Sequence, residues 1–116
     1  MSLSLTLIFE NVPNFGDHGR HVLGHDRLHY GGFSRDRQEA LAALATPLGR
    51  PLYVYEDGGL RATSEDPYGT PLTFITAHML WRSKLLRHSD TRPWDNAIDE
   101  FVRLLPPDTR IILWWS

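Results

Sequence analysis

The side chains of this chain best suited to chemistry gather between Gly16 and Gly32. That segment holds four of the six histidines together with two aspartates. The three later histidines recur every four residues, a spacing that places their imidazoles on one side of either a helix or an extended strand. The candidate metal ligands are His18, His21, His25, His29, Asp17 and Asp26.

Imidazoles brought together in this way could bind zinc or nickel. A catalytic zinc ion commonly has three protein ligands and an open position for water, and a carboxylate can act as a ligand or orient one. One hypothesis is therefore a metal-binding protein or a metal-dependent hydrolase that uses residues 18–29. The alternative is a polar surface loop, because five glycines in the segment argue against a helix that would align the rings.

Length and composition favour one globular domain and exclude several kinds of site. The chain has 116 residues, of which 41% are hydrophobic, and it has no cysteine. A chain of this size buries one modest core. Disulfides, thiol catalysis and cysteine-ligated zinc are excluded. No apolar stretch is long enough to cross a bilayer and no secretory leader is recognisable, so we expect a cytoplasmic protein with no membrane partner.

The charges are unevenly distributed along the chain. The net charge of -2 gives no electrostatic reason to expect a nucleic-acid partner. Basic residues concentrate within 82–92, whereas acidic residues concentrate within 56–66 and 95–108. Segregated charge of this kind favours a protein partner, although solvated surface faces give the same pattern.

Aromatic residues suggest where such a partner would bind. Trp114 and Trp115 are adjacent on a predicted strand, so we expect one to fill the core and the other to be exposed. Exposed aromatic and arginine side chains are typical anchors of protein interfaces. The predicted partner-binding residues are Trp115, Tyr53, Tyr55, Arg82, Arg87 and Arg92.

Two apolar segments, one near each end of the sequence, are predicted to be buried strands. Within Leu3 to Phe9, leucines alternate with Ser4, Thr6 and Ile8, which predicts a central strand with one fully buried face. Ile111 to Trp115 is apolar throughout, which predicts burial on both sides. We expect the two strands to lie side by side in the interior. The Gly/His-rich loop at about 14–32 would then lie outside, with at most a short strand at 27–30.

Helix and turn signals lie between these strands. Ser34 predicts the N-cap of a helix whose apolar face extends to Leu48, with Pro47 and Gly49 ending the helix. The Asp-Gly-Gly sequence at 57–59 predicts a hairpin between strands at 51–56 and 60–64.

Residues 70–87 allow two interpretations. One is a helix that begins at Pro71 with Thr70 as its cap. The other is a strand through Ile75 followed by a helix over 77–87, because the residues before Ala77 are rich in β-branched and aromatic types.

The last predicted helix covers 94–105 and ends at Pro106-Pro107. The full order of elements predicts a single α+β domain over 1–116. It would have an antiparallel or mixed sheet of about four to five strands, with two or three helices packed mainly on one face.

No motif in the chain identifies a family. In class alone it is similar to small, cysteine-free bacterial immunity proteins that neutralise toxins, and this similarity transfers no residue. We therefore expect a non-enzymatic partner-binding or regulatory protein with no cofactor, and the histidine-rich metal protein is the alternative.

Overall fold

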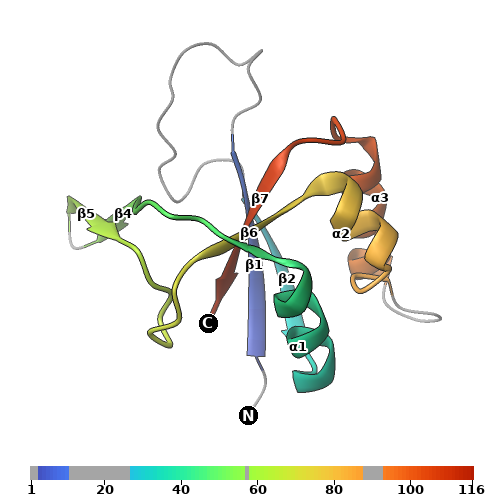
Figure 1. Cartoon of the computed structure of the whole chain (residues 1–116), viewed down its shortest axis with the longest axis horizontal. Coiled ribbons are helices and arrows are strands. Elements are labelled where there is room, and N and C mark those ends of the chain that lie inside the picture. Colours follow the sequence, from blue (N-terminus) through green and yellow to red (C-terminus); the bar gives the residue numbers. More distant parts are fainter. Residues whose placement is uncertain (1–2, 11–26, 57, 88–92) are drawn as a thin grey trace.

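A five-stranded antiparallel sheet forms the centre of the molecule (Figure 1). The computed structural model describes residues 3–10, 27–56, 58–87 and 93–116. The order of strands across the sheet is β2-β1-β7-β6-β3, and β4 and β5 form a separate hairpin. The elements in chain order are β1 (Leu3–Phe9), β2 (Arg27–Phe33), α1 (Arg35–Leu44), β3 (Thr46–Pro47), β4 (Leu52–Glu56), β5 (Gly59–Thr63), β6 (Thr73–Thr76), α2 (Ala77–Ser83), α3 (Pro93–Leu104) and β7 (Arg110–Trp115).

The two predicted central strands do lie side by side. β1 pairs with β7 in antiparallel register, with Leu7 opposite Leu113 and Ile8 opposite Ile112. All four of these side chains are buried, and successive residues of a strand point to opposite faces. The sheet is therefore covered on both faces at its centre.

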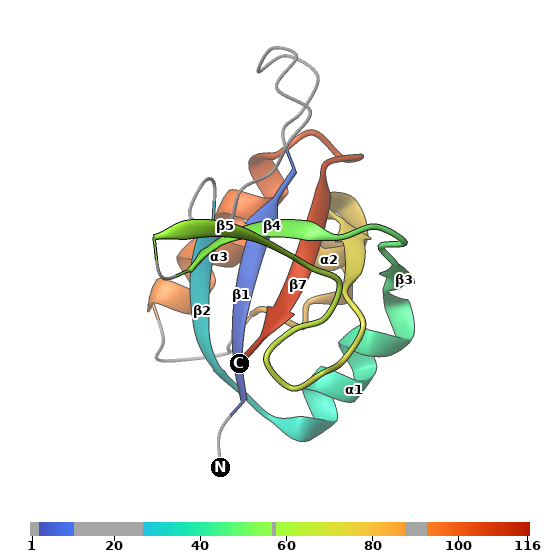
Figure 2. The ribbon, with the colours of Figure 1, turned by 90° about the vertical axis from the view of Figure 1, so that its left-hand side faces the viewer.

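Different elements cover the two faces. Leu7 and Leu113 belong to a core cluster that also contains residues of all three helices, whereas Ile8 and Ile112 belong to a second cluster with Leu52 of β4. Figure 2 shows the β4–β5 hairpin crossing in front of the sheet, with the helices behind it. This arrangement confirms the predicted single α+β domain with helices on one face. None of the described helices is long and apolar enough to cross a membrane.

The first helix is shorter than predicted. Ser34 caps it as expected, since its hydroxyl accepts a hydrogen bond from the Arg37 amide at 3.3 Å. The helix ends at Leu44, however, and Leu48 lies beyond it, buried in the cluster under the hairpin. The extension to Leu48 was wrong because the residue before Pro47 is restricted to extended backbone, and Thr46 accordingly pairs with Phe74 of β6.

The predicted loop at 14–32 was too long at its C-terminal end. β2 begins at Arg27 and continues to Phe33, and it pairs with β1 over its whole length. Its register shifts opposite Leu5 and Thr6, and Gly31 takes a φ of 103°, which other residues rarely adopt. A bulge thus accommodates glycines that we had expected to end the strand. Residues 14–26 of the predicted loop lie outside the described residues.

Between the hairpin and the last helix, the strand-then-helix interpretation is correct. Thr73 to Thr76 forms β6 and pairs with β7, and α2 begins directly after it. The Thr76 hydroxyl accepts a hydrogen bond from the Met79 amide at 3.3 Å and so caps α2. The predicted hairpin is also confirmed, with Gly58 at a φ of 80° in its turn. A helix from Pro71 would have removed β6, the strand that pairs with β7 on the side opposite β1.

Candidate functional site

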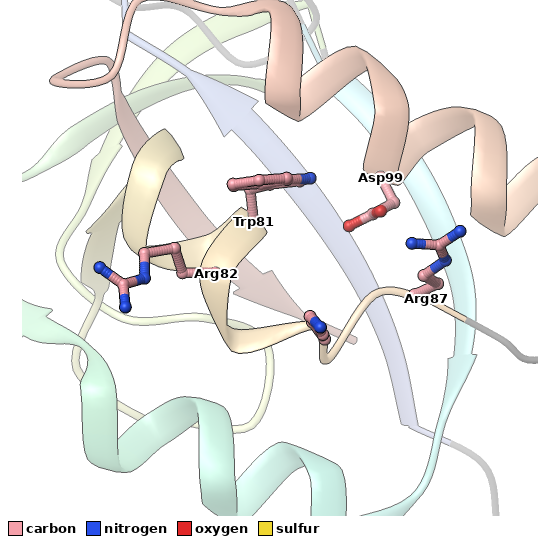
Figure 3. Close-up of a pocket in the computed structure, with 5 residues that line it drawn as sticks. Trp81, Arg82, Arg87 and Asp99 are labelled. Carbon is pink, nitrogen blue, oxygen red and sulfur yellow. The ribbon is translucent and has the colours of Figure 1, made fainter.

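A pocket of about 270 Å³ opens between the end of α2 and the middle of α3 (Figure 3). Both helices lie on the same face of the sheet and contact each other. The side chains that line it are Trp81, Arg82, Lys84, Arg87 and Asp99.

Asp99 is the unusual member of this pocket because it is a buried carboxylate. Asp99 lies on the buried side of α3 with Ile98 and Val102, and Val102 is about one helical turn after Ile98 and Asp99. The packing of these apolar neighbours therefore buries the carboxylate as well. Only 5% of the residue is exposed, and its Oδ1 has no hydrogen-bond partner among the described residues. Burial raises the pKa of Asp99, and the positive charge of Arg87 opposes part of that rise.

The turn at the C-terminal end of α2 positions two basic residues of the pocket, Lys84 and Arg87. Lys84 is the C-cap and has a φ of 58°, the single positive φ of a non-glycine residue in the described part of the chain. The Ser83 hydroxyl donates to the Leu80 carbonyl at 2.6 Å and accepts from the Leu85 amide at 3.2 Å. These bonds hold a tight turn that brings Arg87 round to face α3.

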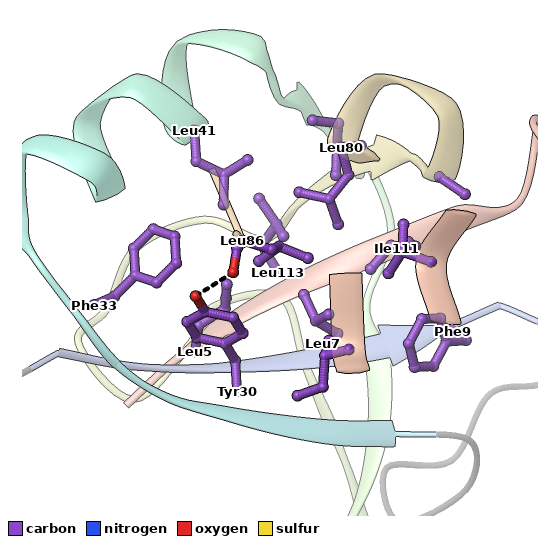
Figure 4. Close-up of a cluster of buried hydrophobic side chains, with 14 of the residues drawn as sticks. Leu5, Leu7, Phe9, Tyr30, Phe33, Leu41, Leu80, Leu86, Ile111 and Leu113 are labelled. Carbon is purple, nitrogen blue, oxygen red and sulfur yellow. Dashed lines mark hydrogen bonds between the residues drawn. The ribbon is translucent and has the colours of Figure 1, made fainter. Parts of the chain in front are cut away.

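Two side chains from other elements fix this turn in place. The Tyr30 hydroxyl of β2 donates to the Leu86 carbonyl at 2.6 Å, as the dashed line in Figure 4 shows. Arg37 of α1 donates to the Leu85 carbonyl and, at 3.1 Å, to the Tyr30 hydroxyl. Its guanidinium also lies 4.4 Å from the centre of the Phe33 ring. The wall of the pocket that carries Lys84 and Arg87 is therefore anchored to the sheet and to α1.

The pocket can bind charge of both signs beside an aromatic ring. Three of its side chains are cationic at neutral pH, and one is a carboxylate that water reaches poorly. The Arg87 charge acts on the Asp99 carboxylate within the same pocket. The arrangement suits recognition of a small charged ligand.

A second feature is a row of apolar side chains on the exposed side of α3. Trp94, Ala97, Phe101 and Leu104 follow one another at spacings of three and four residues, so they form one continuous row along the helix. We call this row the α3 stripe. Trp94 is 59% exposed and Leu104 is 69% exposed.

Contacts at two points hold the α3 stripe against the sheet, one on the edge strand β2 and one on its neighbour β1. The Trp94 indole N–H donates to the His29 carbonyl of β2 at 3.1 Å. The Phe101 ring meets the Phe9 ring edge-on, with 5.5 Å between their centres. The sequence analysis did not identify the α3 stripe, although the spacing of Trp94, Ala97, Phe101 and Leu104 already carried the signal.

Another buried carboxylate, Asp66, has a structural role. Its Oδ1 accepts hydrogen bonds from the backbone amides of Tyr68 and Thr70, at 2.9 and 3.1 Å. Burial raises the pKa of Asp66, and these two bonds oppose the rise. The residue thus holds the turn at 66–69, where Gly69 has a φ of 80°.

The predicted metal site falls mostly outside the described residues. His29 lies on β2 with its Nδ1 3.2 Å from the Thr6 hydroxyl, and the residue is exposed. Within the described ranges, no group of three or more histidines and carboxylates could hold a metal ion. The remaining candidates, His18, His21, His25, Asp17 and Asp26, lie in residues that the structure does not describe. Metal binding therefore stays a prediction.

The expectation that Trp115 is an exposed anchor was wrong. Trp115 is 5% exposed, and its ring meets Phe33 edge-on at 5.4 Å. Trp114 points the other way and packs against the cluster under the hairpin. Two adjacent tryptophans alternate between the faces as predicted, but both faces of this sheet are covered, so neither ring is fully exposed.

The other predicted partner-binding residues do not form one surface. Arg82 and Arg87 both line the pocket on the helical side of the sheet. Tyr53 is exposed on β4, which lies on the opposite face (Figure 2). The Tyr55 side chain and the whole of Arg92 lie outside the described part of the chain.

Comparisons with protein-family models, with curated proteins and with solved structures found no match.

Proposed function

We propose that this domain is a non-enzymatic partner-binding protein that docks another protein on its α3 stripe. The observation that supports the proposal is the continuous row of exposed apolar side chains, which includes a tryptophan, on a helix whose other side is buried in the core. Isolated exposed apolar residues are ordinary on protein surfaces, whereas a contiguous row marks an interaction site.

The residue types in the α3 stripe suit a protein interface. Tryptophan is among the residues whose truncation most often costs 2 kcal/mol or more at interfaces, roughly the level that defines a hot spot. Trp94 and Phe101 offer large rings that lose little conformational entropy on binding. An apolar patch on the partner would complement them.

The α3 stripe is also preorganised. Ile98 and Val102 fix α3 in the core, and the His29 carbonyl holds the Trp94 indole in one orientation. A rigid surface loses little freedom when it binds, which leaves more of the contact energy for affinity. As part of the same proposal, the protein acts in a bacterial cytoplasm, and the absence of cysteine supports that compartment.

A site-specific cross-linking experiment tests the proposal. A photoreactive amino acid is placed at Leu104 in one variant and at Leu60 in a second, and both are irradiated in the source cell. Leu60 is a matched control because it is also a strongly exposed leucine, at 57%, but lies on the hairpin. We expect a defined protein adduct from the Leu104 position and none from Leu60.

Adducts at equal yield from both positions, or none from Leu104, would contradict the proposal. Once the partner is known, Trp94→Ala is expected to weaken its binding by about 30-fold or more, which corresponds to a hot spot. Circular dichroism of the variant shows whether α3 is intact.

A further inference from the structure

We infer that the pocket between α2 and α3 binds a small zwitterion in which a cationic amine and a carboxylate sit on one carbon, as in a free α-amino acid. The site is separate from the α3 stripe, because Asp99 is buried and the α3 stripe is exposed on a different side of the same helix. The inference therefore goes beyond the proposed partner-binding function.

The two signs of charge in the lining select this ligand class. A simple anion would satisfy Lys84 and Arg87 but would lie against the Asp99 carboxylate. A simple cation would satisfy Asp99 but would face the two basic side chains. A zwitterion places an attractive charge against each, and complementary charge excludes ligands that carry one sign.

The cationic half of the ligand belongs near Asp99 and Trp81. A buried carboxylate oxygen without a hydrogen-bond partner, such as Asp99 Oδ1, is costly, and a charged N–H donor beside it restores the solvation it has lost. Figure 3 shows the Trp81 indole and the Arg87 guanidinium on either side of the Asp99 carboxylate. The indole gives an ammonium group an aromatic contact next to its counter-charge.

The anionic half belongs near Lys84 and Arg87. Both are held on the turn that Tyr30 and Arg37 anchor, so their positions relative to Asp99 are fixed by the fold. The Arg82 side chain points away from Asp99 in Figure 3 and contributes mainly to the outer rim. At about 270 Å³ the pocket is smaller than the range of roughly 300–1,000 Å³ typical of drug-sized ligands, which suits a molecule as small as an amino acid.

The test uses the full chain and ligands that differ by one charge. Binding of alanine, N-acetylalanine, alaninamide and inorganic phosphate is measured by following the Trp81 indole N–H resonance in NMR titrations. The other common amino acids are titrated in the same way, since the side chain sets affinity but not the charge requirement. We expect alanine or another amino acid to bind at least about tenfold more tightly than its acetylated or amidated form, because each lost charge removes a charge-assisted hydrogen bond.

Matched variants assign the binding to the pocket. Asp99→Asn keeps the shape and removes the negative charge, and Arg87→Gln removes one positive charge. Arg103→Gln is the control, because Arg103 is on the same helix but pairs with Glu100 at the surface. We expect the first two to weaken amino-acid binding about tenfold or more and the control to leave it unchanged.

Several results would overturn the inference. These are no amino acid binding, phosphate binding more tightly than every amino acid, blocked forms binding as well as free ones, or Asp99→Asn binding as tightly as the unmodified chain. Asp99→Asn is expected to fold, since it removes a buried charge, and its NMR spectrum verifies this. Cross-linking from Leu104 is independent of all these titrations, so failure of one proposal leaves the other standing.

Discussion

The Tyr30 hydroxyl joins the sheet to the turn that carries Lys84 and Arg87. It donates to the Leu86 carbonyl at 2.6 Å and accepts from Arg37 at 3.1 Å, and Tyr30 is 1% exposed. Tyr30→Phe removes these two bonds and keeps the ring, which packs edge-on against Phe33 with 5.2 Å between their centres. The substitution therefore isolates the hydrogen bonds from the packing.

The expected cost follows from what is left unpaired. The Leu86 carbonyl loses a partner in a buried place, and a buried polar group left unsatisfied costs about 1–3 kcal/mol. Arg37 keeps its bond to the Leu85 carbonyl, so its side chain adds little to the loss. We predict that the free energy of unfolding falls by about 2 kcal/mol. At an m-value of about 2 kcal/mol/M, the urea midpoint falls by about 1 M.

Urea denaturation followed by circular dichroism measures this change. Tyr53→Phe is the control, because Tyr53 is an exposed tyrosine on the hairpin, and we expect it to shift stability by less than about 0.5 kcal/mol. A Tyr30→Phe variant as stable as the control, with an unchanged m-value, would refute the conclusion that this hydroxyl anchors the turn. If the anchor is real, the variant also binds amino acids more weakly in the pocket.

Three other predictions concern stability. Burial raises the pKa of Asp99 above its ordinary value of 3.8, so the folded protein holds this proton to higher pH than the unfolded chain, and stability falls as pH rises through that window. Urea titrations across pH should show a smaller decline for Asp99→Asn, and parallel profiles would contradict this sign. Trp115→Ala should cost about 3–5 kcal/mol, because it empties a core position, and a two-state melt close to that of the unmodified chain would show that the ring is not buried. Ser34→Ala should cost about 1 kcal/mol through loss of the α1 cap, measured by the same denaturation; Ser64→Ala is the control, because Ser64 is an exposed serine outside the helices, and an equal effect there would argue against the cap.

Local signals predicted much of the fold because they act within a few residues. The Ser34 cap, the Gly58 turn and the apolar run of β7 each depend on neighbouring residues, and the structure has all three where the sequence placed them. The choice at 70–87 was harder. The β-branched residues of β6 form a strand because β7 offers them a partner, and that partner is far away in the chain.

The candidate site was harder to predict because burial depends on the whole fold. Asp99 belonged to an acidic stretch that suggested a solvated face, and only the packing of α3 against α2 shows that it is buried. The alternation at Trp114 and Trp115 did not show which ring would be exposed, because Trp115 packs into the cluster under the helices and Trp114 packs against the cluster under the hairpin. Arg82 and Arg87 were selected for their charge, and the turn after α2 places Arg87 in the same pocket as Arg82 of the helix.

The affinity of the cross-linked partner for two single variants tests the central claim most directly. Leu104→Arg places a charge in the α3 stripe, and Leu60→Arg places the same charge on the hairpin, at a leucine that is also mostly exposed. Measured by calorimetry with the purified partner, Leu104→Arg should abolish or greatly weaken binding while Leu60→Arg leaves the Kd unchanged. Equal affinity of the two variants would show that the partner does not bind at the α3 stripe.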